Sequence, residues 1–131
     1  MYELQKVTDE FIRVISNPLS SNEDVNASLQ PCFKILPDSA EEDVNIFMKR
    51  LITLTTLPNM ERASLATTIC GYLVENGFPS EAVLYDFIDF YEELLDKSRP
   101  FFEILSVHIN KMRVVQEERE EAINQIYSEL L

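Results

Sequence analysis

A chain of 131 residues, 46% hydrophobic and 26% charged, has the length and composition of one folded domain with a single core. It contains only two glycines, which argues against a hairpin-rich β-sheet and against a glycine-rich phosphate-binding loop. Its formal charge of −12 repels nucleic acids and anionic membrane surfaces and favours cationic partners, although many soluble proteins are acidic without such a partner.

The chain offers few residues for metal or redox chemistry. Cys32 and Cys70 are isolated cysteines, and together with His108 they are too few for a zinc cluster. We expect both cysteines to be small buried residues in a reducing compartment, although the sequence also allows a disulfide between them. The first residues lack a signal-peptide pattern, and no apolar run approaches the roughly 18–20 residues of a membrane span. We therefore expect a soluble, cytoplasmic protein.

Regularly spaced prolines divide the chain. Pro37, Pro58, Pro79 and Pro100 are each separated by 21 positions, and Pro18 lies 19 positions before Pro37. Proline is tolerated in a connection or in the first turn of a helix but disrupts a helix interior. The spacing therefore predicts joints between helices of similar length.

The first two helices differ in the strength of their patterns. Apolar residues recur at helical spacing from Leu4 to Ile15, which predicts a first helix there. Pro31 interrupts the second segment, so we expect a short helix from about residue 22 to 30 and then a turn. Ser20 and Glu23 have the spacing of a capping box for this helix.

The two central segments, 39–57 and 59–76, carry clearer boundary patterns. Ser39 precedes Glu42 by three residues, which is the capping-box spacing, and Asn59 suits the N-cap of the next helix. At the end of that helix, Gly77 suits the left-handed position after the C-cap, and Pro79 prevents continuation. Each segment has a broad apolar face, so both are predicted to be amphipathic helices.

Residues 81–96, EAVLYDFIDFYEELLD, combine six carboxylates with four aromatic residues and contain no basic residue. On a helical wheel, the predicted core stripe is Leu84, Phe87, Ile88, Tyr91, Leu94 and Leu95. Carboxylates beside tyrosine favour a basic partner, because charge steers the encounter and aromatic rings supply contact area. We expect the partner-binding surface to comprise Tyr85, Asp86, Asp89, Glu92, Glu93 and Asp96.

Residues 100–131 are predicted to form one long helix of about 48 Å at 1.5 Å per residue. Such a helix is too long to pack throughout against neighbours of about 18 residues. Either its end overhangs the domain and pairs with another helix, or a bend between Gln116 and Glu121 folds the end back onto the core. In the first case, the expected oligomerisation surface is Ile123, Ile126, Tyr127 and Leu130.

These patterns predict a single all-α domain over residues 1–131, built as an antiparallel bundle of five or six helices. Two helical hairpins, from residue 39 and from residue 80, are offset by about 42 residues, a period also found in HEAT and armadillo-like repeats. The resemblance is one of period only. It implies an alternative architecture, two HEAT-like hairpins preceded by an N-terminal helical cap.

The sequence shows little sign of catalysis. His108 is the only histidine, and no metalloprotease, nucleophile-elbow or Walker motif occurs. Asp86, Asp89 and Glu93 lie on one side of a helix, but a solvated acidic face explains them better than a metal site. We expect no cofactor and no enzymatic activity.

Two functions from different classes remain. The first is a non-enzymatic acidic module that binds a basic protein, acting as an inhibitor. In class, though not in motif, it is similar to small acidic helical inhibitors of basic nucleases such as toxin immunity proteins. The alternative is a helical scaffold or homo-oligomerisation domain that acts through the C-terminal amphipathic helix. Neither involves nucleic acid or membranes.

Overall fold

The computed structural model describes residues 2–80, 83–95 and 100–130, and every regular element in these residues is a helix. This confirms the predicted all-α class and the expected number of helices. Two short 3-10 helices, η1 (Leu36–Asp38) and η2 (Leu54–Thr56), follow α2 and α3. The six α-helices are α1 (Tyr2–Ser16), α2 (Asn22–Ile35), α3 (Glu41–Thr53), α4 (Met60–Glu75), α5 (Leu84–Leu95) and α6 (Pro100–Leu130).

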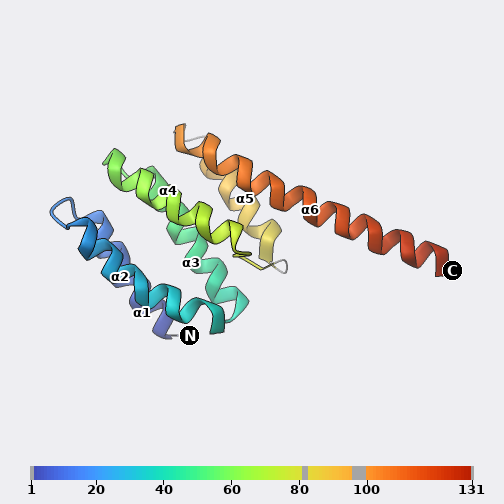
Figure 1. Ribbon diagram of the computed structural model, residues 1–131, viewed down its shortest axis with the longest axis horizontal. Coiled ribbons are helices and arrows are strands. Elements are labelled where there is room, and N and C mark those ends of the chain that lie inside the picture. The colour runs from blue at the N-terminus through green and yellow to red at the C-terminus, as the bar shows by residue number, and fades with distance from the viewer. Residues whose placement is uncertain (1, 81–82, 96–99, 131) are drawn as a thin grey trace.

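Consecutive helices pair as hairpins, and the hairpins stack side by side (Figure 1). Helix α1 packs against α2, and α3 packs against α4. Between hairpins, α1 contacts α3, α3 contacts α5, and α4 contacts α6. The helices therefore form two layers, one of α1, α3 and α5 and the other of α2, α4 and α6. In the second layer, α2 and α4 meet at few positions.

The core lies mainly around α3, the helix that contacts α1, α4 and α5. Its side chains Phe47, Met48 and Ile52 are at most 2% exposed, as are Phe11 of α1 and Phe87 of α5. Burial of large apolar side chains at these positions supplies most of the driving force for folding. The core thus fixes α5 against α3.

The prolines lie at the joints, as their spacing predicts. Pro18 is in the connection between α1 and α2, Pro37 is in η1, and Pro58 and Pro79 lie in the connections before and after α4. Pro100 is the first residue of α6, where its missing N–H has no intrahelical partner to lose.

The predicted turn at Pro31 is wrong, because α2 continues through this proline to Ile35. Proline in a helix interior costs about 3 kcal/mol, since it removes one backbone hydrogen bond and crowds the carbonyl four residues earlier. Pro31 and Ala27 are both exposed, so water can reach that carbonyl. Buried Leu29 and Cys32, on either side of the proline, hold both halves of the helix in the core.

Two predicted capping boxes are also wrong. The box of α2 uses Ser21 and Asp24, one residue later than expected, with reciprocal bonds of 3.0 and 3.1 Å. At α3 the N-cap is Ala40, which has no side-chain cap. The Ser39 hydroxyl instead donates to the Ile35 carbonyl at 2.9 Å, so the end of α2 takes the group that the prediction assigned to α3.

Both ends of α4 agree with the sequence prediction. The Asn59 side chain accepts a hydrogen bond from the backbone N–H of Arg62 at 3.2 Å. Gly77 adopts a φ of 87°, and the backbone N–H of Phe78 donates to the Leu73 carbonyl at 3.0 Å. With the bond from the Gly77 N–H to the Val74 carbonyl, these contacts form a Schellman motif.

Helix α6 is helical over 31 residues, which corresponds to about 46 Å at 1.5 Å per residue. Figure 1 shows its C-terminal part projecting from the stacked hairpins without turning back toward them. The fold-back arrangement is therefore not the one that the chain adopts.

Candidate functional site

Five of the six residues predicted for the apolar face of α5 are buried or partly buried, and the side chain of the sixth, Leu95, lies outside those that the structure describes. Leu84, Phe87, Ile88 and Tyr91 are at most 3% exposed, and Leu94 is partly buried against the core. With this face inward, the carboxylates of α5 lie on the outer faces of the helix. The remaining question is which of those carboxylates are available to a partner.

Asp86 is exposed and is paired with two residues of α3. Its Oδ2 accepts hydrogen bonds from Lys49 Nζ at 2.6 Å and from Asn45 Nδ2 at 2.7 Å. The hydrogen bond from Lys49 and, to a smaller extent, the one from Asn45 favour the charged carboxylate. They hold the pKa of Asp86 below its ordinary value. The Lys49 ammonium also lies 5.5 Å from the centre of the Phe90 ring. Asp86 therefore helps to join α5 to α3.

Glu92 and Tyr85 join α5 to α6. The guanidinium of Arg113 pairs with the Glu92 carboxylate, and the Tyr85 hydroxyl donates to Glu120 Oε2 at 3.4 Å. Desolvation, followed by the negative charges of Glu120 and Glu117, raises the pKa of Tyr85. Glu92 lies seven residues after Tyr85 on α5, and its partner Arg113 lies seven residues before Glu120 on α6. The two helices are therefore antiparallel.

The rest of the predicted acidic surface is small. Asp89 and Glu93 are exposed, lie one turn apart, and have no hydrogen-bond or ion-pair partner among the described residues. Asp96 lies outside the described residues. Of the six residues expected to bind a partner, three have contacts within the protein, and two carboxylates remain available.

The end of α6 forms the largest exposed apolar feature of the predicted sites. The contact between Tyr85 and Glu120 places the start of α5 beside residue 120, so residues 122–130 extend past α5. We call residues 122–130 the α6 tip. Its large apolar residues Ile123, Ile126, Tyr127 and Leu130 are 46%, 57%, 63% and 77% exposed. Their spacing puts them on one face of the helix.

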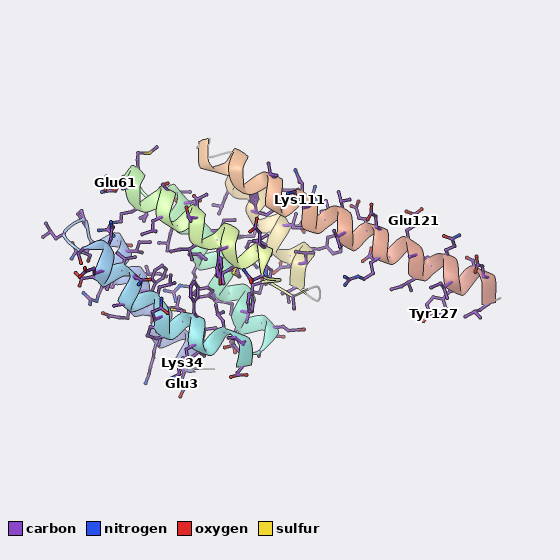
Figure 2. All side chains as sticks on the ribbon, viewed as in Figure 1. Glu3, Lys34, Glu61, Lys111, Glu121 and Tyr127 are labelled. Atoms are coloured by element: carbon purple, nitrogen blue, oxygen red, sulfur yellow. The ribbon has the colours of Figure 1, made fainter. Side chains whose placement is uncertain are left out.

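Figure 2 shows the side chains of the α6 tip, including Tyr127, directed away from the helix axis with no other helix beside them. Glu129 is the only charged residue of the tip, and it is exposed. An apolar helix face with a single charge is a surface that gains free energy by being covered.

A groove between α2 and α4 was not predicted. It has a volume of about 790 Å³, and Val25, Leu29, Leu65 and Ile69 supply apolar walls. Arg62 also lines it and is only 8% exposed. One guanidinium nitrogen, Nη2, donates to the Ser20 carbonyl, whereas Nη1 is buried without a hydrogen-bond partner.

One sequence feature could have identified Arg62. It lies four residues before Ala66 and seven before Ile69, on the apolar face of its helix. An arginine at such a position at least partly buries its side chain against the neighbouring helices. No comparable sequence pattern identifies Lys49 and Arg113 as partners of α5, because they are 37 and 21 residues from the carboxylates that they contact.

Cys32 and Cys70 are free and buried, and burial raises the pKa of their thiols to about 11 and about 12. No group of three His, Cys, Asp or Glu residues among those described could hold a metal ion. None of the described helices is both long enough and apolar enough to span a bilayer. The structure does not describe the side chain of His108.

Comparison with known proteins gives no match to a protein-family model, a curated protein or a solved structure.

Proposed function

We propose that the protein is a helical scaffold that associates with a second copy of itself through the α6 tip. The observation that carries this proposal is a row of four exposed apolar side chains on one face of the helix end: Ile123, Ile126, Tyr127 and Leu130. No other described helix covers this face. Covering such a face is the usual reason for two amphipathic helical surfaces to associate.

The energetics favour reversible association. Complete burial of one large apolar side chain contributes roughly 1.5–3 kcal/mol, and the four side chains are already partly covered by their own helix. Together they contribute roughly 3–6 kcal/mol, from which the entropy cost of association must be subtracted. This supports an assembly whose population depends on protein concentration rather than a permanent one.

Electrostatic repulsion between two α6 tips is weak. The chain carries a net charge of −12, but the tip carries only Glu129. Repulsion between the acidic bodies of two copies is screened over about 8 Å at physiological ionic strength.

Light scattering at several protein concentrations tests the proposal. Ile126→Asp places a charge in the apolar face, and Asn124→Asp places the same charge on the opposite face of the same turn. The wild-type chain and Asn124→Asp should show an average mass that rises with concentration, whereas Ile126→Asp should remain monomeric. A wild-type chain that is monomeric throughout, or equal effects of the two substitutions, contradicts the proposal.

Binding of a basic protein by α5 is a second candidate function, favoured by exposed Asp89 and Glu93 and by the neighbouring Tyr85 ring. In this version a partner rich in lysine and arginine contacts these two carboxylates, and an inhibitory role follows if that partner is a basic enzyme. Asp86 and Glu92 contribute less than the sequence pattern suggests, since a partner must compete with Lys49 and Arg113 for them.

A fluorescent lysine- and arginine-rich helical peptide provides the probe for this second candidate. Asp89→Lys/Glu93→Lys should abolish binding, whereas Glu118→Lys/Glu121→Lys, which changes the net charge equally on α6, should retain it. If both double variants lose binding to the same extent, only the net charge matters, and the α5 surface is not a specific site.

A further inference from the structure

The groove between α2 and α4 arises from the stacking of the hairpins. Helix α4 packs closely against α6 on one side but meets α2 at few positions on the other. The space left between α2 and α4 has a volume of about 790 Å³ and is partly open to solvent. Its walls are largely apolar or uncharged, and its charged lining residues are Glu61 and Arg62. Such a groove can accept the apolar face of a helix.

Arg62 gives the groove a chemical preference. Its side chain is more than nine-tenths buried, and no carboxylate of the described residues forms an ion pair with it. Nη1 lacks any hydrogen-bond partner. Burial of a cation without a counter-ion is unfavourable, and an anion brought beside the guanidinium relieves this cost. The groove therefore favours a ligand that is both apolar and negatively charged.

The α6 tip has these properties and a suitable length. Its nine residues span about 12 Å, and the wall of the groove from Met60 to Ile69 spans about 14 Å at the helical rise of 1.5 Å per residue. The tip offers four large apolar side chains for the apolar walls. Glu129, next to Leu130 and three residues after Ile126, offers one carboxylate, and no described residue pairs with it.

The tip and the groove of one molecule are far apart. Figure 2 shows Glu61, which lines the groove, and Tyr127, which belongs to the tip, near opposite ends of the long axis. The tip cannot fill the groove of its own chain while α6 remains straight. It can reach only the groove of another copy.

We infer that the α6 tip of one copy binds in the α2/α4 groove of the next, with Glu129 supplying the counter-charge of Arg62. This inference rests on the proposed self-association and specifies its geometry. The contact joins two different surfaces, so it is heterologous and leaves one free tip and one free groove after each step. The products are open chains or closed rings, of which the smallest is a reciprocal pair with each tip in the groove of the other copy.

Complementation between two defective variants tests the inference. Ile126→Asp damages the tip and leaves the groove intact. Thr68→Glu adds a carboxylate to an exposed position of the groove and leaves the tip intact. Each variant alone should be monomeric by sedimentation velocity. An equimolar mixture should form a species of two chains and nothing larger, because only one productive contact is available.

The charge pairing has its own test. Arg62→Gln should weaken association by about tenfold or more, the loss expected for a contact to a charged group. Glu61→Gln removes the opposing charge from the same groove and should strengthen association. Matching circular dichroism spectra for wild type and variants would show that neither substitution unfolds the chain. If Glu61→Gln weakens association instead, the groove does not receive an acidic segment.

The outcomes separate this inference from the proposed function. If Thr68→Glu and Arg62→Gln associate as wild type does while Ile126→Asp is monomeric, the tip is an interface but its target is another tip. That result overturns the inference and leaves the proposed function standing. If the wild-type chain and the mixture of variants are both monomeric, the proposed function and the inference fail together.

Discussion

Replacing Phe87 with alanine tests whether the acidic helix α5 is fixed to the body of the protein by its aromatic core face. Phe87 is 0% exposed, Phe90 on the same helix is partly buried, and Tyr85 is 41% exposed. The three aromatic residues are close in sequence and differ mainly in burial. Their alanine variants should therefore rank in that order of destabilisation.

The expected magnitudes follow from burial. Truncation of a fully buried phenylalanine to alanine typically costs about 3–5 kcal/mol, because the transfer free energy and a cavity term add. Phe90→Ala should cost about 1–2 kcal/mol, for partial burial and the contact with the Lys49 ammonium. Tyr85→Ala should cost less than about 1 kcal/mol, as expected for an exposed side chain with one long hydrogen bond.

Urea and thermal unfolding followed by far-UV circular dichroism measure these differences. An unfolding entropy of about 2.1 cal/mol/K per residue gives roughly 0.28 kcal/mol/K for 131 residues. A loss of about 4 kcal/mol for Phe87→Ala therefore lowers the midpoint temperature by about 15 °C. Equal losses for the three variants, or a larger loss for Tyr85→Ala than for Phe87→Ala, would refute the assignment of the core face.

Three further predictions concern the fold. Gly77→Ala should lower stability by about 1–2 kcal/mol in urea unfolding, because the φ of 87° disfavours alanine while the added Cβ meets no atom within 4 Å; a much larger loss would indicate a steric clash instead. The pKa of Asp86 is depressed in the folded state, so its contribution is present above the ordinary value of 3.8 and is lost as the pH falls through the folded pKa. The stability difference between wild type and Asp86→Asn should shrink on acidification, and a difference independent of pH would show that the contacts with Lys49 do not favour the carboxylate. Cys32 and Cys70 should react with a thiol reagent at neutral pH far more slowly in the native protein than in urea, and immediate reaction of both would contradict their burial.

Features set by local sequence could be predicted. The prolines at the joints, the Schellman motif at Gly77 and the core stripe from Leu84 to Tyr91 each depend on backbone geometry or periodicity within a few residues. Two local features were exceptions. Pro31 does not end α2, because burial of Leu29 and Cys32 on both sides of it outweighs its local effect. The capping boxes predicted for α2 and α3 are not the ones that form.

Features that depend on packing between helices could not be predicted in the same way. The acidic stretch appeared to be free of basic neighbours, yet Lys49 and Arg113 reach Asp86 and Glu92 from other helices. The groove beside Arg62 exists because α2 and α4 meet at few positions, and helical periodicity within one segment contains no information on that spacing. The length of α6 relative to its neighbours left two arrangements open, an overhang and a bend that folds the end back, and the choice between them depends on packing rather than on local sequence.

Amide hydrogen exchange at low and high protein concentration tests the central claim most directly, because it reports which surface becomes covered. At low concentration, residues 122–130 are a helix end without tertiary support and should exchange quickly. At high concentration, self-association through the tip should slow exchange in this segment while the buried core of α3 remains unchanged. Identical exchange of residues 122–130 at both concentrations would contradict the account.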